Sequence, residues 1–197
     1  KAQMRQGSMI AYQDDLGAGM QPDIFKRFYW WEDECVDLVT EKLGVSVEHR
    51  SFRALAARAG AVPDARVDEA WRRWEGRIPI LGLSPTARAE AMRLFVALSA
   101  ELDESGEVIA AGINCLNESA TSLTTPCLAW NLLFEERGIM WGCEADLTAM
   151  LTEFIVHKSL EVPVMMSNLY PFLLGDAALK HERIPFFPEL EHPENHI

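Results

Sequence analysis

Positive charge is scarce in this sequence, and long apolar runs are missing. The 197 residues include 18 Lys and Arg against 30 Asp and Glu, which gives a formal net charge of −12 at pH 7. A nucleic-acid interface needs a clustered basic face, and basic residues also hold proteins to anionic membranes. No apolar stretch has the length that crossing a bilayer requires. We therefore expect neither nucleic acid nor a membrane as a partner.

Cysteine is also scarce, and the glycine-rich loops that bind phosphate are missing. The cysteines at 35, 115, 127 and 143 show no CxxC spacing, so neither a zinc cluster nor a disulfide framework is indicated. Three of them lie in or beside apolar segments, and we interpret all four as reduced, buried thiols of a cytoplasmic protein. The segment Gly17-Ala18-Gly19 has neither the GxGxxG nor the P-loop spacing, which removes the usual signal for nucleotide binding.

What the sequence does contain is an alternation of short apolar runs with helical patterns. Ser84 before Pro85, and Thr125 before Pro126, are typical of an N-cap followed by the first helical residue. Gly138 has the position of the left-handed residue that ends a helix. The expected strands are 8–12, 45–47, 108–113, 139–143 and 162–167, and the expected helices are 24–43, 51–58, 64–74, 85–102, 126–137 and 147–157.

The order of these elements predicts the fold class. The last three expected strands are joined by two helices, which makes consecutive βαβ units and a parallel sheet. Their nearly continuous apolar character fits strands that are covered on both faces. We therefore predict an α/β fold, a doubly wound, mostly parallel sheet with helices on both faces in a three-layer sandwich. Residues 1–168 are expected to form a central α/β domain, and residues 169–197 a connecting segment toward a further C-terminal domain.

Polar side chains follow three of the expected strands: Asn117 and Glu118, Glu144 and Asp146, and Asn168. Because parallel strands end at one edge of the sheet, we expect Glu118 and Asp146 to converge there, where α/β proteins bind ligands. Hard divalent cations prefer such carboxylate oxygens. Glu118 and Asp146 are therefore candidate metal ligands and catalytic groups. Glu144, Asn117 and Asn168 are candidates for positions around the metal or for contacts with substrate.

Two of the residues near these strand ends have structural explanations. Asp146 directly precedes the expected helix 147–157, where it is placed to act as an N-cap. Cys115 follows the strand 108–113, but no histidine lies near it in the sequence as a partner for a nucleophile. We interpret Cys115 as a buried structural thiol.

Four segments resemble the central region of the L-fucose isomerase family, which includes L-arabinose isomerase-like proteins. They are GINCLNES at 112–119, the Thr-Thr-Pro helix start at 124–126, GCEADLTAML at 142–151 and VPVMMSN at 162–168. The resemblance implies that Glu118 matches the first metal-binding carboxylate of the family and that Asp146 matches the second. The family also uses a histidine from its C-terminal domain, which no position of this sequence matches.

The function that the resemblance implies is metal-dependent aldose–ketose isomerisation of a sugar such as fucose or arabinose, through an enediol. The metal is a divalent cation, typically Mn²⁺, and the parent protein is expected to be a homo-oligomer. In this chemistry the metal polarises the carbonyl and a carboxylate moves a proton between C1 and C2. Which carboxylate is the base stays open. The chain alone is expected to be an inactive part of the enzyme, and the alternative is a non-catalytic sugar-binding or regulatory module on the same fold.

Overall fold

The computed structural model describes residues 4–14, 29–78, 82–115, 122–164 and 166. The chain divides into two units after residue 165, and every element described below belongs to the first unit. Three of the candidate residues, Asn117, Glu118 and Asn168, lie outside the described residues. The predicted division into a domain at 1–168 and a connecting segment at 169–197 therefore stays a prediction.

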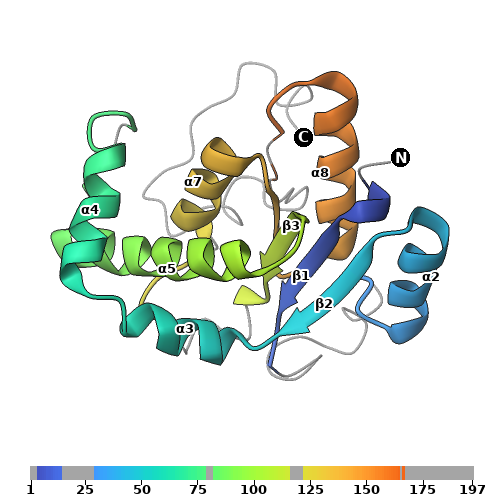
Figure 1. Cartoon of the computed structure of the whole chain (residues 1–197), viewed down its shortest axis with the longest axis horizontal. Helices are drawn as coiled ribbons and strands as arrows, with labels where there is room; N and C mark the ends of the chain where they lie inside the picture. The colour runs from blue at the N-terminus through green and yellow to red at the C-terminus, as the bar shows by residue number, and fades with distance from the viewer. Residues whose placement is uncertain (1–3, 15–28, 79–81, 116–121, 165, 167–197) are drawn as a thin grey trace, which may run out of the picture. The chain divides into compact units, whose positions relative to one another are not determined.

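Four parallel strands form a single sheet in the described part of the chain (Figure 1). They are β1 (Ser8–Tyr12), β2 (Ser46–Arg50), β3 (Val108–Ile113) and β4 (Met140–Cys143). The strand order is β2-β1-β3-β4, so the chain starts in the middle, adds β2 on one side and then crosses over to add β3 and β4 on the other. This reversal of direction is what defines a doubly wound sheet, and ligands bind beside it at the carboxyl ends of the strands.

Helices cover both faces of this sheet. They are α2 (Asp33–Leu43), α3 (Phe52–Gly60), α4 (Asp64–Trp74), α5 (Pro85–Glu104), α7 (Cys127–Arg137) and α8 (Leu147–Leu160), with a short 3-10 helix η1 (Met4–Gln6) before β1. None of the helices in the described part of the chain combines the length and the apolar character that a membrane crossing requires.

Alternate residues of β1 pack against the helices on opposite faces of the sheet. Ile10 and Tyr12 pack with α3, α4, α5 and α7, whereas Met9 and Ala11 pack with α2 and α8. All four side chains are fully buried. Since successive side chains of a strand point to opposite faces, burial of all four requires a helix layer on each side. The predicted α/β three-layer sandwich is confirmed.

The local signals that begin and end the helices are mostly those expected. The Ser51 and Ser84 side chains accept hydrogen bonds from the N–H groups of Ala54 and Ala87, at 3.1 Å each. Gly138 ends α7 in the left-handed conformation, with φ of 65°. The start of α7 is corrected: the carbonyl of Pro126 accepts the first helical hydrogen bond, from Trp130, so Pro126 itself occupies the N-cap position and Thr125 does not.

Two predicted elements differ from the structure. The helix expected at 24–43 begins only at Asp33, because residues 29–30 form a turn; residues 24–28 are not described. The strand expected at 162–167 is wrong for residues 162–164, which are not in a strand, while residues 165 and 167 are not described. Helix α8 continues to Leu160, and the His157 ring Nδ1 donates to the carbonyl of Val162 at 2.7 Å, which folds this segment against the helix end.

Two glycines bring β3, β4 and the following loop unusually close together. Gly112 and Gly142 lie opposite each other in the register of the two strands. A Cβ atom on Gly112 would lie 2.6 Å from the Gly142 carbonyl oxygen and 2.8 Å from the Ala145 Cα atom. A Cβ atom on Gly142 would lie 2.9 Å from the Asp146 carbonyl oxygen. Only glycine at both positions allows the loop after β4 to fold back over the two strands.

This packing predicts that Gly112→Ala destabilises the protein by about 1–3 kcal/mol, since the new methyl group overlaps backbone atoms that have no room to move. Gly106→Ala is the matched control, because nothing lies within 4 Å of a Cβ atom there. The measurement is the free energy of unfolding in urea. Equal stability of the two variants would contradict the close approach described here.

Candidate functional site

The described part of the candidate site is the loop that follows β4. Glu144 and Ala145 both have positive φ angles, 59° and 56°, in a region that residues with a side chain rarely adopt. The segment around Tyr29 and Trp31 holds them there. The Trp31 indole Nε1 donates to the carbonyl of Ala145 at 2.9 Å, the Tyr29 hydroxyl donates to Glu144 Oε2, and the N–H of Leu147 donates to the Tyr29 carbonyl at 3.1 Å. Strain maintained by several specific contacts is common at functional sites.

Asp146 is the N-cap of α8, as its structural explanation predicted. Its Oδ1 accepts hydrogen bonds from the Thr148 N–H at 2.8 Å, the Thr148 hydroxyl at 2.6 Å and the Ala149 N–H at 3.1 Å. Every hydrogen bond that the described residues make to this carboxylate ends on Oδ1. Capping therefore fixes the orientation of the carboxylate, and Oδ2 accepts no hydrogen bond from the described residues.

Glu144 lies between these two features and is half-buried. Burial raises the pKa of the Glu144 carboxyl above its usual value, and the neighbouring charge of Asp146 raises this pKa further. The carboxylates of Glu144 and Asp146, which are separated by one residue, thus have different environments. Asp146 accepts hydrogen bonds from three donors at the start of α8, and Glu144 accepts one from the Tyr29 hydroxyl. Such a difference in environment is what separates the roles of paired carboxyl groups.

The predicted convergence of Glu118 with Asp146 lies outside the described residues and stays a prediction. Within the described ranges, no three His, Cys, Asp or Glu side chains gather closely enough to hold a metal ion. The described residues therefore form only part of a site for a hard cation. Asp146 Oδ2 would supply one carboxylate oxygen, and the remaining ligands, such as a carboxylate oxygen of Glu118, would come from outside the described residues.

The side-chain amides of Gln13 and Asn114 are buried at the same edge of the sheet. Gln13 was not identified as a candidate from the sequence. Gln13 follows β1 and Asn114 follows β3, the two central strands, with exposed fractions of 6% and 0%. Because Tyr12 is in register with Ile113, these next two residues are neighbours. Their backbone N–H groups are bonded, but their side-chain oxygen and nitrogen atoms have no hydrogen-bond partner among the described residues. A buried unpaired amide is costly, so these groups mark a place where a ligand or another segment supplies partners.

The alternation of side chains places both amides on the face covered by α2 and α8. Met9 and Ala11 of β1 pack on that face, so Gln13 continues their row, as Asn114 continues the row of Ala110. Ala145 belongs to the same apolar cluster, directly over Gly112. The amides and the strained loop therefore border one region at the carboxyl edge of the sheet.

A further acidic residue, Glu153 of α8, was also missed. Its side chain is 8% exposed, between Met150 and Phe154 on the apolar face of the helix. Burial raises its pKa to about 7, with a smaller contribution from the charge of Asp146, against a hydrogen bond from the Trp141 backbone that lowers it. The signal that the sequence offers is a charged residue within an apolar stripe.

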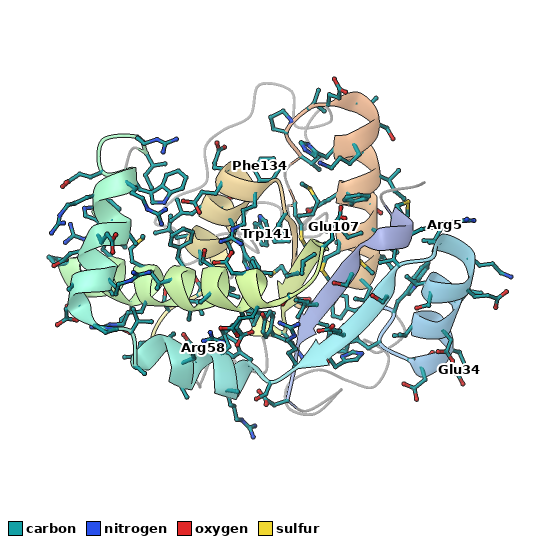
Figure 2. The ribbon with its side chains drawn as sticks, viewed as in Figure 1. Arg5, Glu34, Arg58, Glu107, Phe134 and Trp141 are labelled. Atoms are coloured by element: carbon teal, nitrogen blue, oxygen red, sulfur yellow. The ribbon has the colours of Figure 1, made fainter. Side chains whose placement is uncertain are left out.

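A different polar cluster on the opposite face is fully paired. The buried Tyr12 hydroxyl donates to Glu101 Oε2 at 2.8 Å, and burial raises the pKa of Tyr12 well above its usual value. Arg50 donates to the Ser105 hydroxyl at 2.9 Å, and Arg58, which Figure 2 labels on α3, donates to Glu104 of α5 at 3.0 Å. Since each charge in this cluster has a partner, we interpret it as structural.

The prediction of four buried thiols is wrong. Cys127 is exposed, and the other three cysteines are only half-buried, although none of the four is in a disulfide. The reason is local: Cys127 is the first residue of α7, and Cys115 and Cys143 lie at strand ends and not inside the sheet.

Neither any model of a known protein family nor any curated protein matches this chain.

The raised pKa of Glu153 predicts a specific pH dependence of stability. The folded-state value near 7 lies above the ordinary value of 4.5, so the folded chain binds this proton more tightly than the unfolded chain does. The stabilisation is complete below pH 4.5 and is lost as pH rises through 7. We expect the free energy of unfolding of the wild type, relative to Glu153→Gln, to fall by roughly 1–3 kcal/mol between pH 4.5 and pH 8. A difference that does not change with pH would refute this prediction.

Proposed function

We propose that this chain carries part of the active site of a metal-dependent aldose–ketose isomerase, an intramolecular oxidoreductase that acts on a sugar such as fucose or arabinose. The observation that carries the proposal is the set of groups at one edge and on one face of the sheet. These are the unpaired amides of Gln13 and Asn114 and the strained loop that holds Glu144 and Asp146. The resemblance of the surrounding segments to the L-fucose isomerase family supports the same assignment.

The two amides suit a sugar. Each amide offers both a donor and an acceptor, and each sugar hydroxyl does the same, so the two kinds of group pair in either direction. Because Gln13 and Asn114 are already buried, most of the cost of removing water from them is met in folding and not on binding. Few, fixed polar groups among apolar walls are what small-molecule sites of this type use for orientation.

The carboxylates suit the chemistry. Asp146 Oδ2 and Glu118 would hold the divalent cation, with further protein ligands completing its coordination, and Mn²⁺ is the proposed metal. When bound, the cation supplies Lewis-acid polarisation of the sugar carbonyl. The residues of the chain orient C1 and C2, with Glu144, Asn117 and Asn168 proposed as contacts around them, and a carboxylate moves the proton between the two carbons through an enediol. The parent protein is proposed to be a cytoplasmic homo-oligomer.

The alternative function is sugar binding without chemistry, by a non-catalytic or regulatory module. One observation favours it: the unpaired amides of Gln13 and Asn114 account for sugar recognition without any cation, and the described residues supply only part of a metal site. Binding of fucose or arabinose that is equally tight with and without Mn²⁺, in a complete protein that isomerises neither sugar, would favour this alternative.

The assignment of Asp146 predicts the effect of Asp146→Asn in the complete protein. We expect Mn²⁺-dependent isomerisation to fall by on the order of 100-fold or more, since Lewis-acid catalysis contributes several kcal/mol. The asparagine oxygen still caps α8, so stability falls by only about 0.5–1 kcal/mol. Glu118→Gln is expected to be equally inactive.

Ser84→Ala is the matched control, because it removes the cap of a different helix: the Ser84 side chain accepts a hydrogen bond from the Ala87 N–H at 3.1 Å at the start of α5. It is expected to lower stability by about 1 kcal/mol and to leave turnover unchanged. Near-normal turnover of Asp146→Asn would exclude the metal-carboxylate mechanism.

The unpaired amide of Gln13 predicts that removing its polar atoms raises the stability of the sugar-free protein and weakens sugar binding. Gln13→Met keeps the length of the side chain and removes its polar atoms, so we expect the sugar-free protein to become more stable by about 1 kcal/mol, since no hydrogen bond within the described residues is lost. Sugar affinity is expected to fall about tenfold, the equivalent of one hydrogen bond of 1.4 kcal/mol. Urea unfolding and calorimetric titration measure the two effects. A variant that is less stable and binds normally would show that Gln13 is structural.

A further inference from the structure

We propose that Cys115 and Cys143 form a redox-active dithiol site that closes reversibly to an intramolecular disulfide. Their Sγ atoms lie 3.4 Å apart in the reduced protein. A disulfide bond is about 2.05 Å long, so small rotations of two side chains close the gap. The proposal needs only two thiols and does not depend on the isomerase assignment.

The backbone explains why these two thiols meet. Cys143 ends β4 and is in register with Ile113, the last residue of β3, and Cys115 follows two residues later. Ile113, Cys115 and Trp141 all belong to the apolar cluster on the α3–α7 face, which places the thiol pair on the face opposite to Glu144 and the buried amides. The pair is thus separate from the candidate sugar site, although both lie at the same edge of the sheet.

A small disulfide can reach this pair from solvent. Cys115 lines a pocket of about 200 Å³ together with Phe52, Ser122, Thr124 and Pro126. The described lining is mainly apolar, with the hydroxyl groups of Ser122 and Thr124 among it, and none of the described lining residues is acidic, so none of them would repel an anionic oxidant. The asymmetry of the pair also favours one order of attack, because the hydrogen bond from the Cys143 thiol lowers the pKa of Cys115 and raises that of Cys143.

The reaction balances with a low-molecular-weight disulfide such as glutathione disulfide as oxidant. The Cys115 thiolate attacks one glutathione sulfur, the S–S bond breaks, and one glutathione leaves as a thiolate that takes up a proton. Cys143 then loses its proton and attacks the Cys115 sulfur of the mixed disulfide, which releases the second glutathione. Two protein thiols are oxidised and one glutathione disulfide is reduced to two molecules of glutathione; excess reduced glutathione reverses both steps.

The test is a thiol count on the full chain in glutathione buffers, followed by alkylation in denaturant and peptide mapping by mass spectrometry. The sequence has four cysteines, so the number of alkylated thiols is expected to fall from four to two on oxidation, with one cross-linked peptide pair that contains Cys115 and Cys143. Reduced glutathione is expected to restore all four. Cys127→Ser, the matched control, is expected to form the same cross-link, because Cys127 lies exposed at the start of α7.

Cys115→Ser is expected to keep its three remaining thiols under the same buffer, whereas Cys143→Ser is expected to stop at a mixed disulfide of Cys115 with glutathione, because no second thiol resolves it. Should either variant fail to fold, the peptide map of the wild type decides alone. In the wild type, a cross-link that joins Cys127 or Cys35, glutathione adducts without any cross-link, or four unreacted thiols in a fully oxidising buffer would each overturn the proposal.

Discussion

The close approach of β3 and β4 at Gly112 and Gly142 is the constraint on which the sheet edge depends. Without side chains at these two register partners, the loop after β4 lies directly over the sheet, with Ala145 against Gly112 and the backbone of Asp146 against Gly142. The loop then needs two consecutive residues in the left-handed region, and Trp31 and Tyr29 hold it there from a distant part of the sequence. Both the cap of α8 and the position of Glu144 follow from this one fold-back.

The alternation of strand residues gives this edge two different chemistries. Gln13, Asn114 and the loop of Glu144 border the α8 face, while Cys115 and Cys143 lie toward the face of α3 and α7. Because successive side chains of an extended chain point to opposite faces, Asn114 and Cys115 lie toward different faces of the sheet although they are adjacent in sequence. A disulfide between the cysteines would nevertheless restrain both strand ends, so the oxidation state of one face bears on the geometry of the other.

Local sequence signals predicted the fold well where one short segment decides the structure. The strand 108–113, the Ser84 cap and the Gly138 helix end depend on neighbouring residues, and each was predicted. Predictions failed mainly at the ends of elements. The predicted strand at 162–167 was displaced at its start by a longer α8 and the contact of His157 with Val162. Of the thiols predicted as buried, Cys115 and Cys143 lie at strand ends and Cys127 begins α7. Asp146 was placed correctly as a cap, but the unpaired amide of Gln13 depends on burial that no sequence period reveals.

Several unfavourable features of the described residues lie on the α8 side of this edge. Positive φ angles at Glu144 and Ala145, unpaired buried amides and the buried carboxyl of Glu153 all lie in or beside one apolar cluster. The charged cluster around Tyr12 on the opposite face, by contrast, has a partner for each charge. Buried groups without a partner among the described residues also occur on the opposite face, at the indole N–H groups of Trp71, Trp74 and Trp130. What distinguishes the α8 side is the combination of two buried amides with a strained loop at the carboxyl ends of the strands. Their persistence together is explained if a ligand at this edge supplies the missing partners.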